Sequence, residues 1–350
     1  MKLEDFFDES PFTLMADEAS AKHWAGRPAV LKSIDKIIRR LLRRDESSFD
    51  IVWADLGAGK SHTLYYLASR LSDDTNKRIC VIVEMPEQIK NFRDLYQRIV
   101  QKLPFDQLAN YVLRSGTVDV ENLDRAARAI VHGTPEDREL AIQWLIAERP
   151  DLRRLKQSTG ITSRIESDAT ATDVLSSLIS CLSANDIRFC LMIDEFQRIG
   201  KLAESSRSKV TSSLRSTLSK NPRNFSVIVS IFSKIEKTAM SFIPDELLTL
   251  MGMSRPVMLP EMNETEAIDF VRERMKAFRP LNYDGEEFAP IGEMAVRRAI
   301  ETIAQSSHHS LIPRTILQAI SLLYDEVPDN LSPLTSEEVD DALMTLQAAS

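Results

Sequence analysis

IVWADLGAGKSHTLYYLA, residues 51–68, is the stretch of the sequence that decides the fold. A short apolar run, Phe49–Trp53, is followed at once by a turn with two glycines and then by a helical pattern over His62–Leu71. A strand, a glycine-rich turn and the N-terminus of a helix form the setting in which backbone N–H groups bind phosphate. Residues 54–61 are therefore the candidate phosphate loop.

The candidate phosphate loop carries the residue types that nucleotide binding needs. Lys60 is placed to reach the β- and γ-phosphates, and the Ser61 hydroxyl to complete the ligand shell of Mg²⁺. The usual pattern begins with glycine, whereas this loop begins with Ala54, which a backbone of positive φ would disfavour. The expected nucleotide-binding residues of the stretch are Gly57, Ala58, Gly59, Lys60, Ser61 and His62.

A second apolar run, RFCLMIDE over residues 188–195, ends in two neighbouring carboxylates. A buried strand would deliver Asp194 and Glu195 to its carboxyl end, where open α/β sheets bind their ligands. We expect Asp194 to hold Mg²⁺ through water, and Glu195 to orient and deprotonate the attacking water. The phosphate loop and the acidic pair together predict an ATPase.

Elsewhere the pattern alternates strands and helices up to about residue 260 and is helical afterwards. This order predicts an α/β fold, a P-loop parallel sheet flanked by helices, with a C-terminal α-helical lid. We expect an N-terminal segment over 1–28, an ATPase core over 29–260 with a helical insertion over about 91–184, and a lid over 261–350. The strand-like runs are 49–53, 78–84, 189–193, 225–231 and 256–259, and the lid helices are expected over 264–278, 292–305, 313–326 and 335–348.

These motifs and their order resemble the AAA+ superfamily of P-loop ATPases, in particular its origin-recognition and initiator clade. The resemblance runs from Gly26-Arg27 to Pro313-Arg314 and so covers most of the chain. It implies that Arg27 belongs to a segment on the adenine side of the nucleotide. It also implies that Arg314, at the start of a lid helix, contacts ATP within the same subunit.

The same resemblance implies two further roles in hydrolysis. A polar residue at the tip of the strand after the acidic pair would sense the γ-phosphate; Ser233 is the first candidate and Ser230 the second. An arginine would be donated to the ATP of a neighbouring subunit; Arg255 matches that position and Arg223 is the alternative. Such an arginine stabilises transition-state charge, so hydrolysis would need an oligomer.

Short motifs in the predicted insertion resemble, more loosely, ATPases of bacterial phage-exclusion systems of the BREX type. They include Phe92–Tyr96, Trp144-Leu145 and Gly160-Ile161. The predicted lid ends with the sequence, which leaves no room for the winged-helix domain that initiators append. Transposon target-selector ATPases have a similar compact plan. The resemblance therefore implies a role in bacterial defence or in transposition.

Four arginines gather near the end of a helical pattern over residues 30–44, namely Arg39, Arg40, Arg43 and Arg44. They could face the phosphates of double-stranded DNA, or form a solvated helix end where the helix dipole favours cations. The formal net charge of −8 argues against a generally basic surface. Two functions follow: an oligomeric ATPase that recruits effectors to DNA, and a nucleotide-switched signalling or scaffold protein that acts only through protein partners.

Signals for export, membrane insertion or metal binding are weak. The acidic N-terminus lacks the layout of a signal peptide and no run of 18 apolar residues occurs, so we expect a cytoplasmic protein without a membrane partner. Cys80, Cys181 and Cys190 lack metal-ligand spacing and are expected as reduced core thiols. His308-His309 has no further ligands nearby to complete a metal site.

Overall fold

The computed structural model of the protein describes residues 6–15, 17, 20–72, 77–116, 120–251, 255–306, 310–328, 332 and 334–348. Contacts within the chain divide it into two compact units. The lid unit comprises Met1–Lys36, Ala54–Ser69 and Val257–Ser350, and the sheet unit comprises Ile37–Trp53 and Arg70–Pro256. Each unit has a hydrophobic core of its own.

A five-stranded sheet has the order β2-β3-β4-β1-β5. β2 pairs with β3 and β3 with β4 in parallel, and the register places Glu84 opposite Asp194 at the carboxyl ends. β3 is buried from Arg188 to Ile193, as expected for a parallel strand covered on both faces. The strands are β1 (Ser48–Ala54), β2 (Arg78–Glu84), β3 (Arg188–Asp194), β4 (Phe225–Phe232) and β5 (Val257–Met258), close to the predicted runs.

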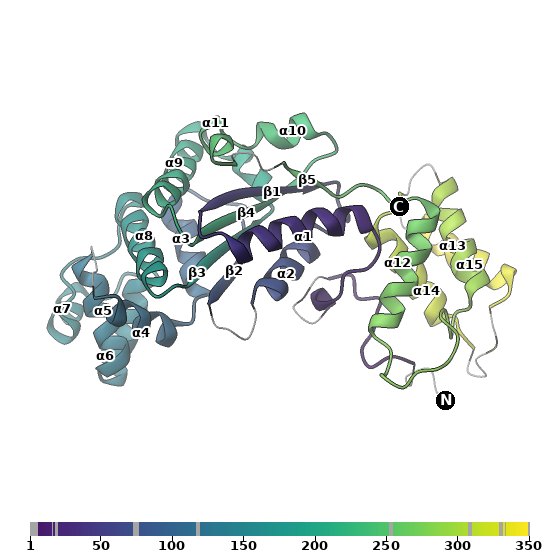
Figure 1. The fold of residues 1–350 in the computed structure, drawn as a ribbon, viewed down its shortest axis with the longest axis horizontal. Coiled ribbons are helices and arrows are strands. Elements are labelled where there is room, and N and C mark those ends of the chain that lie inside the picture. The colour runs from purple at the N-terminus through teal and green to yellow at the C-terminus, as the bar shows by residue number, and fades with distance from the viewer. Residues whose placement is uncertain are drawn as a thin grey trace. The chain divides into compact units, whose positions relative to one another are not determined.

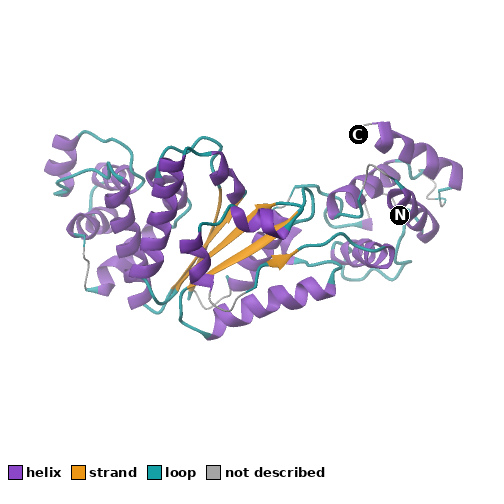
Figure 2. Ribbon diagram, turned by 90° about the horizontal axis from the view of Figure 1, so that it is seen from above, coloured by secondary structure: helices purple, strands orange, loops and turns teal. Residues whose placement is uncertain are grey.

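Between β2 and β3 the described chain is helical, as the pattern over residues 91–184 predicts. α3 packs against α8 and against α9 (Glu204–Lys220), while α4, α5 and α6 pack on one another in sequence order (Figure 1). Figure 2 shows the strands of the sheet in orange and the helices in purple. Trp144 and Leu145 are buried in this core, where the Trp144 indole donates to the Ser163 carbonyl at 2.7 Å. The helices are α3 (Phe92–Gln101), α4 (Phe105–Ser115), α5 (Glu121–His132), α6 (Pro135–Leu145), α7 (Leu152–Thr159) and α8 (Asp168–Ala184).

Shorter helical pieces follow β3 and β4 in the sheet unit. The acidic pair leads into a 3₁₀ turn and then into a long helix that packs on α8. These elements are η3 (Phe196–Lys201), α9 (Glu204–Lys220), α10 (Glu236–Ser241), α11 (Asp245–Leu248) and η4 (Thr249–Met251).

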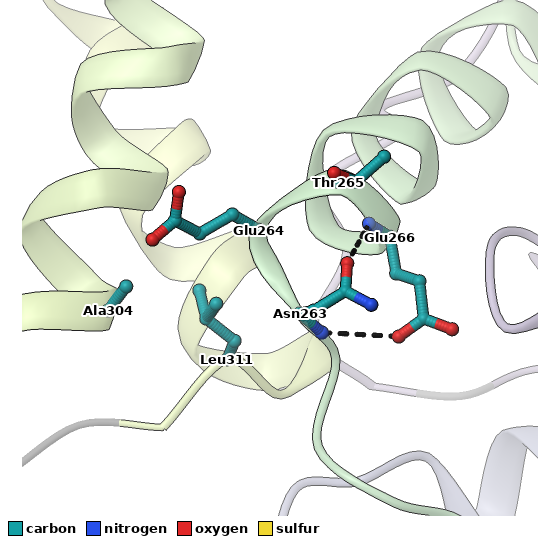
Figure 3. Close-up of a pocket in the computed structure, with 6 residues that line it drawn as sticks. All are labelled: Asn263, Glu264, Thr265, Glu266, Ala304 and Leu311. Carbon is teal, nitrogen blue, oxygen red and sulfur yellow. Dashed lines mark hydrogen bonds between the residues drawn. The ribbon is translucent and has the colours of Figure 1, made fainter.

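Four C-terminal helices form the core of the lid unit. The first begins with the predicted capping box, in which Asn263 accepts from the Glu266 N–H at 2.9 Å and the Glu266 carboxylate accepts from the Asn263 N–H at 3.1 Å (Figure 3). This reciprocal pair satisfies two of the unpaired donors at a helix start. The helices are α12 (Glu264–Ala277), α13 (Glu293–Gln305), α14 (Pro313–Asp325) and α15 (Ser336–Ala348), each within two residues of its predicted range.

The N-terminal segment is anchored on the lid helices. Phe12 is buried in the lid core, and its ring lies 5.2 Å from that of Tyr324. The buried Arg274 guanidinium on α12 donates to the carbonyls of Pro11 at 2.8 Å and Ser20 at 3.3 Å. These contacts bring the chain to the start of α1 (Pro28–Arg43), after the 3₁₀ turn η2 (Ser20–Lys22).

In the part of the chain that the structure describes, no helix is both long enough and apolar enough to cross a membrane. None of the three cysteines is in a disulfide, and Cys181 and Cys190 are buried. His308 and His309 lie outside the described residues.

Candidate active site

The predicted phosphate loop joins a buried strand to a helix. β1 ends at Ala54, and α2 (Lys60–Leu71) begins at Lys60. Gly57 and Gly59 have φ of 76° and 98°, a left-handed backbone that glycine adopts without strain. Ala54 is a strand residue without positive φ, so the missing first glycine imposes no backbone strain.

Lys60 points back into its own loop. Its side chain is buried, and Nζ donates to the carbonyl oxygens of Asp55 at 3.0 Å and Ala54 at 3.5 Å. Ser61 follows, half-buried in the first turn of α2. The ammonium and the hydroxyl therefore both lie at the N-terminus of a helix, whose exposed N–H groups favour anions.

The first turn of α14 packs directly on the phosphate loop. The Arg314 N–H donates to the Gly57 carbonyl at 3.3 Å, and the Arg314 side chain is exposed. A Cβ on Gly57 would lie 3.0 Å from Arg314 Cβ and from Ile312 Cδ1. Only a residue without a side chain lets the lid helix start this close to the loop, which brings the backbone of Arg314 next to Gly57.

Arg27 lies beneath the phosphate loop and is 4% exposed. Its Nη1 donates to the Ala58 carbonyl at 2.6 Å, while Nε and Nη2 are buried without a hydrogen-bond partner. Burial lowers the pKa of Arg27 to about 10, a shift opposed by the charges of Glu266 and Glu261. Buried donors without acceptors are rare in proteins, and a bound polar group would complete them.

An aromatic cluster beside the loop was not predicted from the sequence. The Trp24 ring lies 5.3 Å from that of Tyr66 and 6.1 Å from that of His62, both on α2. Burial, and then the charge of Arg274, lower the pKa of His62 to about 4, so the imidazole is neutral near pH 7. The only sequence signal was that Trp24 stands two residues before the Gly26-Arg27 turn.

The acidic pair is held by a buried hydroxyl from the neighbouring strand. Ser230 Oγ donates to Asp194 Oδ1 and accepts from the Glu195 N–H at 3.2 Å. The same N–H also donates to Asp194 Oδ1 at 2.9 Å. Ser233 has a different contact, because its Oγ donates to the Ile235 carbonyl at 2.8 Å and closes the turn after β4. Of the two serine candidates, Ser230 is thus the one that touches the acidic pair.

Two residues that follow the acidic pair were not predicted as site residues from the sequence. One contacts the acidic pair and the other contacts the neighbouring end of β2. Gln197 Nε2 donates to Glu195 Oε2 at 2.7 Å. Arg198 lies 2.6 Å from a Glu84 carboxylate oxygen and donates to the Met85 carbonyl at 2.8 Å. Their position next to the acidic pair was the available signal, but only the structure shows which groups they reach.

The four basic residues of α1 and its end have different surroundings. Arg40 Nη2 lies 2.5 Å from Asp50 Oδ2, and the Asp50 carboxylate is buried. Arg44 lies 3.9 Å from the Glu46 carboxylate, with both side chains exposed. Arg39 and Arg43 are exposed. The Arg40 side chain therefore forms an ion pair that holds α1 to Asp50, and it is at the same time a candidate DNA contact.

The candidates for an arginine that acts on a neighbouring subunit are both exposed. Arg255 directly precedes Pro256 and β5, and Arg223 precedes β4, where its backbone bridges to Glu46.

A pocket at the start of α12 is separate from the phosphate loop (Figure 3). It is lined by Asn263, Glu264, Thr265, Glu266, Ala304 and Leu311.

The site residues predicted from the sequence fall into two groups. The phosphate-loop group lies in the lid unit, and the acidic group lies in the sheet unit. Each motif follows the carboxyl end of a strand of the same sheet. The first group is Arg27, Gly57, Ala58, Gly59, Lys60, Ser61, His62 and Arg314, and the second is Asp194, Glu195, Ser230, Ser233 and Arg255.

Comparison with known proteins identifies the fold. No protein-family model matches the chain, and no curated protein matches its sequence. The ORC2 protein of Aeropyrum pernix, solved as ADPNP–ADP complexes, is 13% identical with a TM-score of 0.61, over 99% of this chain and 73% of that one. CDC6P from Pyrobaculum aerophilum is 14% identical with a TM-score of 0.57, over 97% of this chain and 71% of that one.

The fold is therefore the one seen in these ORC2 and CDC6P structures. The predicted α/β class, with a parallel sheet flanked by helices and a C-terminal helical region, is confirmed.

Proposed function

We propose that the chain is an ATPase that binds and hydrolyses ATP with Mg²⁺, assembles as an oligomer, and acts on DNA or recruits partners to it. The observation that carries this proposal is the phosphate loop, with Lys60 buried inside it and the Arg314 turn packed on Gly57. A second motif, the acidic pair held by Ser230, supplies the groups that hydrolysis needs. The likeness in fold to an ORC2 protein solved with ADPNP and ADP supports nucleotide binding here.

The phosphate loop would bind the nucleotide. Its N–H groups and the Lys60 ammonium would bind the β- and γ-phosphates, while Arg314 approaches from the lid helix. The two unpaired nitrogens of Arg27 suit a polar acceptor on the nucleotide. The Ser61 hydroxyl would bind Mg²⁺ and the Asp194 carboxylate would hold the ion through water, since Mg²⁺ prefers oxygen ligands, and the ion would neutralise charge on the phosphate oxygens.

Hydrolysis would use Glu195 as the base. Its carboxylate accepts a proton from a water molecule while the water oxygen attacks the γ-phosphorus; the bond to the ADP oxygen breaks, which leaves ADP and phosphate. Arg255 from a neighbouring subunit would stabilise the charge that develops, with Arg223 as the alternative. Ser230 and Ser233 are the candidates for sensing the γ-phosphate from β4.

The wider role is proposed in bacterial defence or in transposition, on the resemblance to phage-exclusion and target-selector ATPases. The alternative is a nucleotide-switched signalling or scaffold ATPase that contacts only protein. The net charge of −8 favours the alternative, while the exposed Arg39 and Arg43 and the ORC-like fold favour DNA.

Two substitutions test the ATPase itself. Lys60→Ala removes the ammonium from the loop and should abolish ATP binding, measured by titration of a fluorescent ATP analogue. Glu195→Gln keeps the shape of the side chain but removes its basicity, so binding should persist while phosphate release falls to a small residual rate. Turnover by Glu195→Gln equal to that of the unchanged protein would remove Glu195 from its role.

A separate measurement decides between DNA and protein partners. The double variant Arg39→Glu, Arg43→Glu changes the exposed cations of α1 and leaves the Arg40–Asp50 ion pair in place. Retention on duplex DNA that falls with salt, and that this variant loses, would support the DNA role. The control Arg153→Glu, Lys156→Glu makes the same charge change on exposed positions of α7. Retention unaffected by the α1 variant would favour the protein-partner alternative.

A further inference from the structure

The side-chain amide of Gln197 joins the acidic pair to the tip of the neighbouring strand. Its Nε2 donates to Glu195 Oε2 at 2.7 Å, and its Oε1 accepts from the Phe232 N–H at 2.9 Å. Phe232 is the last residue of β4, the strand that also carries Ser230. One amide thus bridges a carboxylate on one strand end and a backbone N–H on the next.

The contact with Phe232 sets which end of the amide faces Glu195. A backbone N–H can only donate, so it requires the oxygen of the Gln197 amide. The nitrogen must then point away from it, toward Glu195, and a nitrogen that donates to a carboxylate forms a charge-assisted hydrogen bond. The amide therefore has one orientation. Rotating it by 180° would place its nitrogen against the Phe232 N–H, donor against donor, and its oxygen against the Glu195 carboxylate, acceptor against acceptor.

Glu195 is held at its backbone as well. Its φ of 56° is a left-handed conformation that a residue with a side chain keeps only where its surroundings impose it. Ser230 Oγ and Asp194 Oδ1 accept from its N–H. The carboxylate accepts its hydrogen bond from Gln197, and the Nε of Arg198 forms a longer ion pair with the same oxygen at 3.8 Å.

The other nitrogens of Arg198 are directed at a different strand end. Nη1 lies 2.6 Å from the Glu84 carboxylate, and Nη2 lies 4.0 Å from the Glu87 carboxylate. In the part of the chain that the structure describes, Gln197 is thus the side chain that forms a hydrogen bond with the Glu195 carboxylate and so sets its direction.

We infer that Gln197 is a positioning residue for Glu195, an inference that rests on the proposed ATPase activity. It holds the carboxylate in one direction from an anchor on β4, so that the base is oriented before water arrives. A base that is free to rotate meets the attacking water in the right geometry less often, which lowers the rate of the chemical step. Gln197 touches neither phosphate nor water in this role, so ATP affinity should not depend on it.

The test compares ATP turnover and binding of a non-hydrolysable ATP analogue in three proteins. Gln197→Ala should lower kcat by about 10-fold or more, the effect of losing one hydrogen bond to a charged group, with the analogue's Kd within about 2-fold of the unchanged protein. Gln197→Glu keeps the size of the side chain, but it replaces the donor with a carboxylate and should lower kcat at least as far. Gln157→Ala, an exposed glutamine on α7, is the matched control and should leave both constants unchanged.

A double variant separates positioning from a general structural effect. In the Glu195→Gln background, adding Gln197→Ala should leave the residual rate unchanged, because Gln197 acts through Glu195. The inference would be overturned if the losses of the two single variants multiplied in the double variant. It would also be overturned if weaker binding of the ATP analogue by Gln197→Ala accounted for its whole loss of turnover. Full turnover by Gln197→Ala beside an active unchanged protein would overturn it as well. An unchanged protein that hydrolyses no ATP would instead refute the ATPase activity on which the inference rests.

Discussion

Ser230 links the Asp194 carboxylate to the backbone N–H of Glu195 from a buried position on β4. It lies on β4, next to β3, and the parallel register that pairs Ile193 with Val229 brings its hydroxyl level with Asp194. A hydroxyl that donates to one residue of the pair and accepts from the other aligns both. Ser233 lies after the end of the strand and binds only its own turn.

We predict that Ser230→Ala lowers ATP turnover by about 10-fold or more, because a buried hydrogen bond to a carboxylate is lost while the N–H of Glu195 loses one acceptor. Binding of an ATP analogue should change little. Ser233→Ala removes a hydroxyl of the same kind from the turn and is the matched comparison; its turnover should stay within about 2-fold of the unchanged protein. The opposite ranking of the two variants in a steady-state phosphate-release assay would assign the sensing role to Ser233.

The element that bears most directly on the proposed nucleotide binding is the first turn of α14. Its start rests on the phosphate loop, and Gly57 is the residue that allows the approach. Pro313 begins the helix, where its missing N–H is not needed and its φ suits the first turn. The lid helix therefore presents Arg314 to the loop through local helix geometry and one close backbone contact.

We predict that Gly57→Ala weakens binding of an ATP analogue by at least about 10-fold, because an added methyl group meets Arg314 and Ile312 in addition to the left-handed strain of about 1–2 kcal/mol. Gly116 offers a matched control, with φ of 68° and no atom within 4 Å of an added Cβ. Gly116→Ala should introduce the same backbone strain without a steric clash, and it should bind the ATP analogue with unchanged affinity. Equal affinity in Gly57→Ala, measured by titration, would show that the α14 contact does not matter for binding.

At the scale of the whole molecule, the proposed chemistry is divided among parts. The phosphate loop and Arg314 belong to the lid unit, and the acidic pair and Arg255 belong to the sheet unit. Arg255 is exposed, as a residue that acts on another subunit must be before assembly. In the proposed oligomer, a neighbouring subunit would add Arg255 to each ATP.

Mixing two inactive variants tests that arrangement. Lys60→Ala cannot bind ATP but can donate Arg255, whereas Arg255→Ala binds ATP but cannot donate the arginine. Each alone should show little turnover, and a mixture should recover part of it, because some interfaces combine an intact loop with an intact arginine. A mixture of Lys60→Ala with Arg223→Ala tests the alternative candidate, Arg223, in the same way. Unchanged turnover by Arg255→Ala alone, or a mixture no more active than its parts, would rule out action of Arg255 across subunits.

The sequence by itself determined the features whose signals are local. The strand-turn-helix around Lys60, the apolar run that ends at Asp194 and the capping box at Asn263 all depend on neighbours a few residues away. Their elements were predicted to within two residues or so. Such signals survive in a sequence because backbone geometry and hydrogen bonding over one turn set them.

Only the tertiary structure decided which distant side chains meet. It placed Ser230 rather than Ser233 against the acidic pair, bound Arg40 to the buried Asp50, and joined Gln197 to Phe232. These contacts depend on strand order and on register, in which a shift of one residue turns every side chain to the other face. No pattern along the chain encodes that choice locally, because it follows from how the whole sheet and its covering helices pack.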